Sequence, residues 1–156
     1  TLARILRETV GGRLPVDRLR VCATDIDQTA LRKAREGVYP KRVIEGIPSR
    51  YRTRYVRETA GSYRVIDSVR DMVRFEQINL RRPEEVRRVS GCDLILCANV
   101  LIYFGSQVRR KTVHSLARRL RPGGYLLVGF SENLREVDVD LEPVRMGQIT
   151  AYRKTD

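Results

Sequence analysis

The sequence contains no tryptophan, only one histidine and no long apolar run. None of its apolar stretches approaches the ~20 residues that a membrane-spanning helix requires, and no signal-peptide pattern is present. We therefore expect a cytoplasmic protein without membrane insertion. The single histidine, His114, falls inside a helical pattern of apolar residues, where a surface or structural role explains it better than catalysis does.

Cysteine is also scarce. The chain has three, Cys22, Cys92 and Cys97, an odd number whose spacing does not match the common metal-binding patterns. Neither a disulfide framework nor a metal site is expected, and buried reduced thiols are the default interpretation. Redox chemistry at Cys92 and Cys97 is the less favoured alternative.

Acidic residues are outnumbered by basic ones, 19 to 31, which gives a formal net charge of +12. Most of the basic residues are arginines spread along the chain. Such a charge suits an acidic protein partner, a nucleic acid or an anionic membrane, and a solvated surface explains it equally well. Because no basic tract is interleaved with aromatic residues, we expect no DNA or RNA partner. Nucleic-acid methylation is kept only as a minor alternative.

What the sequence does contain is an alternation of helical and strand patterns over 156 residues, a length that suits one domain. The periodicity predicts helices at residues 2–10, between Asp27 and Gly37 and at about 106–121, and buried strands at 19–25, 73–78, 93–98 and 125–130. Short antiparallel strands are expected at 51–56 and 62–66, inside a small inserted subdomain at about 44–70, and in a closing pair from residue 137. We predict an α/β fold with a doubly wound sheet.

Three of the predicted strands end on a polar residue: Asp25, Asn79 and Asn99. Ligands bind at the carboxyl ends of the strands in open α/β sheets, so these residues are candidates for a cofactor site. Asp27 has a structural explanation, because it stands where a helix N-cap belongs. For Asp25 the favoured role is binding of ribose hydroxyls, and a bond to the local backbone is the alternative. Tyr103 follows Asn99 just beyond the third of these strands.

Eight short blocks occur in an order and spacing that invite comparison with known families. They are Ala23-Thr24-Asp25-Ile26-Asp27, Ala34-Arg35-Glu36-Gly37-Val38-Tyr39, Arg64-Val65 with Val73-Arg74-Phe75, Asn79-Leu80, Asp93-Leu94-Ile95, Asn99-Val100-Leu101-Ile102-Tyr103-Phe104, Leu120-Arg121-Pro122-Gly123-Gly124-Tyr125 and Ser131-Glu132. Taken together, over residues 1–156, they resemble the chemotaxis receptor glutamate O-methyltransferases, the CheR-type family.

The resemblance implies a Rossmann-like class I methyltransferase domain that binds S-adenosylmethionine and releases S-adenosylhomocysteine. It assigns Asp25 to the ribose of the cofactor, and Asn79, Leu80 and Asn99 to the cofactor pocket. It places Tyr103, as the catalytic residue, near the transferred methyl group. The implied activity is methylation of glutamate side-chain carboxylates on the cytoplasmic region of methyl-accepting chemoreceptors.

The chemistry of that reaction agrees with what the sequence lacks. A glutamate carboxyl group, with a pKa of about 4.3, is already ionised at neutral pH, so its methylation needs no general base. A carboxylate that attacks a sulfonium also neutralises charge, which favours a dry site that holds the two groups in line. The absence of a credible histidine base, cysteine nucleophile or metal cluster is therefore compatible with this reaction.

Some features depart from the family pattern. Ala98 stands where the family has an arginine, and Phe130 stands where it commonly has a histidine. Residues 55–64 are short for members that dock a receptor tether, so we expect no such docking. A catalytically degenerate signalling module that binds S-adenosylmethionine or S-adenosylhomocysteine is therefore the alternative function.

The family's N-terminal helical domain and first strand have no counterpart in the sequence. That strand lies in the middle of the family's sheet, between the strands that here end at Asp25 and Asn99, so its absence leaves backbone groups unpaired. We therefore expect an incomplete sheet in a chain that is part of a longer protein, with an upstream segment that completes the sheet.

Overall fold

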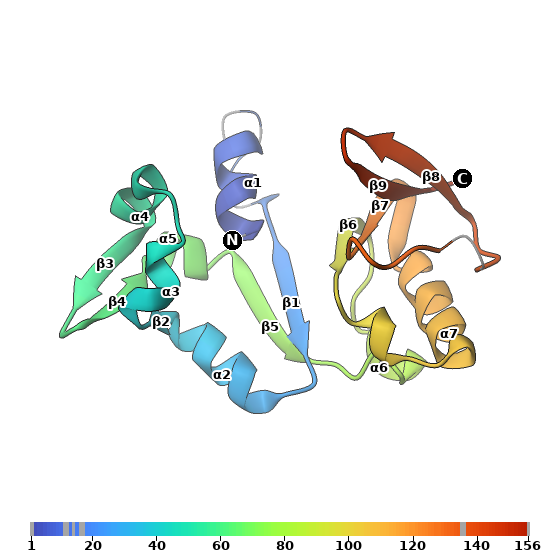
Figure 1. Ribbon diagram of the computed structural model, residues 1–156, viewed down its shortest axis with the longest axis horizontal. Helices are drawn as coiled ribbons and strands as arrows, with labels where there is room; N and C mark the ends of the chain where they lie inside the picture. Colours follow the sequence, from blue (N-terminus) through green and yellow to red (C-terminus); the bar gives the residue numbers. More distant parts are fainter. Residues whose placement is uncertain (1, 11–12, 14, 16–17, 135–136, 156) are drawn as a thin grey trace. The chain divides into compact units, whose positions relative to one another are not determined.

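The computed structural model describes residues 2–10, 13, 15, 18–134 and 137–155. It divides into two compact units, an N-terminal unit of residues 1–77 and a C-terminal unit of residues 78–156. Helices and strands alternate in both units (Figure 1), which confirms the predicted α/β class. No helix in the described ranges is long and apolar enough to cross a bilayer.

The N-terminal unit contains a parallel strand pair, β1 (Val21–Asp25) and β5 (Val73–Gln77). Helix α2 (Gln28–Glu36) follows β1 and begins at Asp27, whose side chain accepts a hydrogen bond of 2.7 Å from the Thr29 amide. It ends at Gly37, whose φ of 63° is the left-handed conformation that glycine adopts at little cost. The predicted cap and stop of this helix are both confirmed.

A second, antiparallel sheet of the same unit has the order β2-β4-β3. Its strands are β2 (Val38–Tyr39), β3 (Val56–Thr59) and β4 (Ser62–Val65). The turn between β3 and β4 consists of Ala60 and Gly61, both with positive φ, as in the two-residue turns that suit the twist of a hairpin.

The strand predicted at residues 51–56 is wrong, because residues up to Tyr55 belong to helix α4 (Ser49–Tyr55). Tyr51 and Tyr55 are four residues apart and so share one helix face. Both reach helix α1 (Leu2–Val10): the Arg4 guanidinium lies 4.0 Å from the centre of the Tyr51 ring, and the Tyr55 hydroxyl donates to the Glu8 carboxylate. Packing against α1 therefore decides the structure of this segment.

Short helices complete the N-terminal unit around a small core. The helices are α3 (Lys41–Glu45) and α5 (Asp67–Arg70). The buried core residues are Ala3, Leu19, Tyr55, Val69 and Met72.

The C-terminal unit contains a four-stranded sheet of order β6-β7-β9-β8. Its strands are β6 (Cys92–Cys97), β7 (Leu120–Val128), β8 (Leu141–Met146) and β9 (Ile149–Lys154), and its helices are α6 (Pro83–Val86) and α7 (Ser106–Ala117). Strands β6 and β7 are parallel, and the other pairs are antiparallel. The core is centred on Val113 and Leu126, both 0% exposed.

Strand β7 begins at Leu120, five residues before the predicted start, and ends at Val128. Its register against β6 shifts between the pairs Cys92–Leu120 and Leu94–Tyr125, so residues 121–124 form an irregularity within the strand. A Cβ atom at Gly124 would lie 3.0 Å from the Cys92 carbonyl oxygen, which explains the glycine there. Pro122, Gly123 and Gly124 therefore lie within the strand, and α7 ends at Ala117, before the predicted helix end at about residue 121.

The strands predicted as buried are more exposed than expected. On β6, Leu94 is 37% exposed and Leu96 is 56% exposed, although both belong to its apolar run. Among the described residues β1 pairs only with β5, and β6 pairs only with β7, so each strand lies at a sheet edge. An edge strand buries less of its surface than a central one, and this accounts for the difference.

Candidate functional site

Asp25 ends β1 in the N-terminal unit, opposite Gln77 at the end of β5. One Asp25 carboxylate oxygen, Oδ1, accepts a hydrogen bond of 2.9 Å from the Asp27 amide. The other oxygen accepts none from the residues that the structure describes, and the side chain is exposed. Both roles considered for Asp25 are therefore compatible, because a local backbone bond uses one oxygen and leaves the second for a ligand.

Gln77 holds the loop that follows Asp25, and the sequence reasoning did not identify this residue. Its side-chain amide donates to the Ile26 carbonyl at 2.9 Å, and its side-chain carbonyl accepts from the side-chain amide of Gln28 at 2.8 Å. The sequence signal for it was its place near the end of the strand predicted at 73–78.

Asn79 and Leu80 lie near the start of the C-terminal unit and are held there by hydrogen bonds and by packing. The Asn79 side chain accepts from the Arg81 amide at 3.0 Å, and the Asn79 amide donates to the Glu85 carboxylate at 2.7 Å. The Asn79 backbone donor lowers the pKa of Glu85 and prevails over burial, which raises it. The Leu80 carbonyl accepts from the Thr112 hydroxyl at 3.3 Å, and the Leu80 side chain packs against the core.

Asn99 and Tyr103 lie on the loop that follows β6. Asn99 has a φ of 60°, in the left-handed region that is uncommon for residues other than glycine. The 3₁₀ helix η2 (Leu101–Tyr103) comes next, anchored by Leu101, which is only 1% exposed. Tyr103 is 80% exposed. The loop thus has a buried foot and presents Asn99 and Tyr103 to solvent.

Glu132, which is only 6% exposed, holds the conformation of this loop. Its Oε2 atom accepts hydrogen bonds from the amides of Gly129 and Asn99, at 2.7 and 2.9 Å. Its Oε1 atom accepts from the amides of Val100 and Ile102, at 3.0 and 3.2 Å. One carboxylate thereby joins the loop after β6 to the loop after β7.

The ionisation of Glu132 and of its neighbour Cys97 follows from these contacts. Burial by itself raises the pKa of Glu132. The backbone donors, those of Gly129 and Asn99 foremost, together lower the pKa by more than burial raises it, so the net shift is downward. Burial raises the pKa of Cys97 to about 11, and the negative charge of Glu132 adds to the effect. At neutral pH Glu132 is a carboxylate and Cys97 a thiol, which argues against thiolate chemistry at Cys97.

Gly129 is the residue that lets the two loops approach each other. A Cβ atom there would lie 2.7 Å from the Asn99 side-chain oxygen and 2.7 Å from the Glu132 carboxylate. The Asn99 backbone nitrogen would lie 2.9 Å from the same Cβ atom, and backbone cannot swing aside as the end of a side chain can, so a larger residue would displace the contact.

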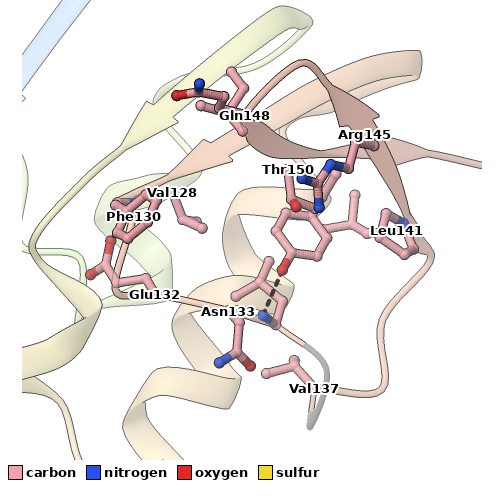
Figure 2. Close-up of a pocket in the computed structure, with 14 residues that line it drawn as sticks. Val128, Phe130, Glu132, Asn133, Val137, Leu141, Arg145, Gln148 and Thr150 are labelled. Atoms are coloured by element: carbon pink, nitrogen blue, oxygen red, sulfur yellow. Dashed lines mark hydrogen bonds between the residues drawn. The ribbon is translucent and has the colours of Figure 1, made fainter.

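A cleft of about 760 Å³ lies next to Glu132 within the C-terminal unit. In Figure 2, Phe130 and Glu132 lie at one end of it, and Leu141 and Arg145 at the other. Its lining includes Tyr152, whose hydroxyl accepts a hydrogen bond of 2.9 Å from the Leu134 amide. Among the residues that the structure describes, Glu132 is the one acid in the lining, and no histidine lines it.

The predicted site residues are therefore divided between the units. Asp25 belongs to the N-terminal unit, and Asn79, Leu80, Asn99 and Tyr103 belong to the C-terminal unit. Asn99 and Tyr103 share one loop. No cluster of three or more metal-ligating side chains occurs among the residues that the structure describes.

A protein-family model described as "CheR methyltransferase, SAM binding domain" matches residues 1–149. The chain belongs to this family. Chemotaxis protein methyltransferase 2 of Vibrio cholerae is 36% identical over 137 residues, which are 87% of this chain and 48% of that protein. Chemotaxis protein methyltransferase 2 of Pseudomonas aeruginosa is 36% identical over 138 residues, 85% of this chain and 48% of that protein.

The CheR-domain chain thus spans about half the length of these relatives. Among solved structures, an O-methyltransferase family protein from Burkholderia thailandensis aligns with 99% of this chain and 57% of its own, with a TM-score of 0.47 and 15% identity. The family predicted from the eight sequence blocks is confirmed.

Replacing Gly129 with alanine tests whether the two loops need this close contact. Gly129→Ala should lower the free energy of unfolding by about 1–3 kcal/mol, since the added methyl group has no room. The control is Gly105→Ala, because a Cβ atom at Gly105 meets nothing within 4 Å and φ there is negative. We expect the control to change stability by less than about 1 kcal/mol, measured by chemical denaturation. Equal losses of stability in the two variants would contradict the conclusion that the loops need a glycine at position 129.

Proposed function

We propose that the protein to which this chain belongs transfers a methyl group from S-adenosylmethionine to glutamate side chains on the cytoplasmic region of chemoreceptors. The observation that carries the proposal is the match of residues 1–149 to the CheR SAM-binding domain. The names of the relatives, chemotaxis protein methyltransferases, support it. We propose a cytoplasmic location, the cytoplasmic region of methyl-accepting chemoreceptors as partner, and no DNA or RNA substrate.

Two side chains have the free polar groups that the cofactor requires. S-adenosylmethionine supplies an electrophilic methyl group on its sulfonium, and its ribose carries two hydroxyls. Asp25 has one carboxylate oxygen without a described partner, which suits the ribose hydroxyls. The Asn99 side-chain amide is exposed and has no hydrogen bond among the described residues, and we assign it, with Asn79 and Leu80, to cofactor binding.

The acceptor needs orientation more than activation. Its carboxylate is ionised at neutral pH, because the ordinary glutamate pKa is about 4.3, so no side chain has to remove a proton. Attack on the methyl group requires an in-line approach at short distance. We assign this positioning to Tyr103, whose exposed ring stands on a loop with a buried foot.

We propose that an upstream segment of the same protein completes the sheet. Strands β1 and β6 each have an edge without a partner among the described residues, and Leu94 and Leu96 on β6 are exposed. A strand added there would pair the free backbone groups and cover apolar surface. The relatives are about twice as long as the matched region, which leaves room for such a segment.

Ala98 favours the second candidate, a module that binds the cofactor or its product without catalysis. It is exposed, one residue before Asn99, and it replaces an arginine expected in the pocket. Loss of a cation there removes a charged contact and leaves Asp25, Asn99 and Tyr103 in place.

Transfer of label from tritiated S-adenosylmethionine to a chemoreceptor cytoplasmic fragment tests the proposal in the full-length protein. A glutamate methyl ester releases volatile methanol in alkali, whereas methyl groups on nitrogen or carbon stay bound. We expect alkali-labile label on the receptor and none when its acceptor glutamates are alanine.

Tyr103→Phe should lower kcat and leave the affinity for S-adenosylhomocysteine unchanged. Cofactor binding without transfer would favour the degenerate module, and stable label in RNA or DNA would overturn the substrate class.

Substitutions at two neighbouring aspartates distinguish an effect on cofactor binding from an effect on stability. Asp25→Asn keeps an oxygen for the Asp27 amide but removes the charge, so the affinity for S-adenosylhomocysteine should fall about tenfold while stability holds. Asp27→Ala removes the helix cap, so the free energy of unfolding should fall by about 0.5–2 kcal/mol at unchanged affinity. Calorimetry and thermal unfolding measure the two effects. An equal loss of affinity in both variants would contradict the role given to Asp25.

A further inference from the structure

Glu132 is a buried carboxylate that is fully occupied by backbone donors. A buried charge is costly unless it is paired or hydrogen-bonded. Here each oxygen accepts two amide hydrogen bonds, at 2.7 to 3.2 Å. A carboxylate used in this way has no lone pair directed to a substrate or cofactor, so any effect on the reaction passes through the groups it holds.

Three of the groups that Glu132 holds are backbone amides at the start of the loop that carries Asn99 and Tyr103. The first amides of a helical turn have no partner within the turn itself. No side chain caps η2 from its N-cap residue, Val100, and the amides of Val100 and Ile102 are bonded to Glu132 instead. The Asn99 amide, beside a φ of 60°, is bonded to the same carboxylate. Glu132 thus caps the 3₁₀ turn as an anion and holds the left-handed residue before it.

We propose that Glu132 is a positioning residue for methyl transfer, which keeps Asn99 in place for the cofactor and Tyr103 in place for the acceptor. This inference rests on the proposed function. The hydrogen bond from the Gly129 amide to Glu132 ties the loop to the end of β7. The sheet therefore fixes the position of the loop that carries Asn99 and Tyr103.

Glutamine is the informative replacement because it keeps the shape of glutamate. Its side chain offers one acceptor oxygen and one amide group that is a donor. In E132Q two of the four backbone amides would face another donor. The neighbouring Ser131 is exposed and has no side-chain hydrogen bond among the described residues, so S131A is the matched control.

The test uses the full-length protein and two readouts. In E132Q we expect the affinity for S-adenosylhomocysteine to fall about tenfold or more, and kcat to fall in addition at saturating cofactor and receptor. S131A should stay within about twofold of the natural protein. An E132Q variant with unchanged affinity and unchanged kcat would overturn the inference.

A double-mutant cycle separates positioning from a general loss of structure. If Glu132 acts through Asn99, the variant with both E132Q and N99A should bind no more weakly than the weaker single variant, within about twofold. Losses of affinity that multiply would show that Glu132 acts independently of Asn99 and would overturn the inference.

Hydrogen exchange in the natural protein decides the matter if E132Q does not fold. The amides of Asn99, Val100 and Ile102 should exchange at least about tenfold more slowly than that of exposed Ser131, and S-adenosylhomocysteine should slow them further. Ligand binding that leaves their rates unchanged would overturn the inference. If the natural protein binds no S-adenosylhomocysteine, the proposed function itself fails, which is a distinct result.

Discussion

The contact on which the C-terminal unit most depends is the one between the Glu132 carboxylate and four backbone amides. Charge-assisted hydrogen bonds of this kind are about twice as strong as neutral ones. They offset the burial of the carboxylate and keep it ionised, as the lowered pKa of Glu132 shows. Because the donors come from the loops after both β6 and β7, one side chain fixes two segments about thirty residues apart. The loop that presents Asn99 and Tyr103 therefore owes its shape to a residue outside it.

Glycines make this arrangement possible at two places, one within β7 and one just after it. Gly124 lets the strand run close to the carbonyl of Cys92 where the register shifts, and Gly129 leaves room for Glu132 to reach Asn99. In the N-terminal unit, Gln77 supports the loop after Asp25 in a comparable way, through its neutral amide. In both units a residue of the neighbouring parallel strand, or just after it, supports the loop that carries a candidate binding residue.

Sequence reasoning recovered the features that depend on local signals. The cap at Asp27, the stop at Gly37, the α/β class and the family all followed from neighbouring residues or from short blocks in order. The helix of residues 49–55 was missed because its two tyrosines gain their partners from α1, far away in the chain. The role of Glu132 was missed for the same reason: its donors are backbone amides, which carry no sequence signature.

Whether one carboxylate organises both loops can be tested without any mutation. Amide proton shifts of Gly129, Asn99, Val100 and Ile102 would be followed by NMR as the pH is lowered from 7. The facing titratable group, the Cys97 thiol, has a pKa of about 11 and does not interfere in this range. We expect one common midpoint for the four amides, below the ordinary glutamate pKa of about 4.3. Amides that do not shift, or that shift with unrelated midpoints, would contradict it.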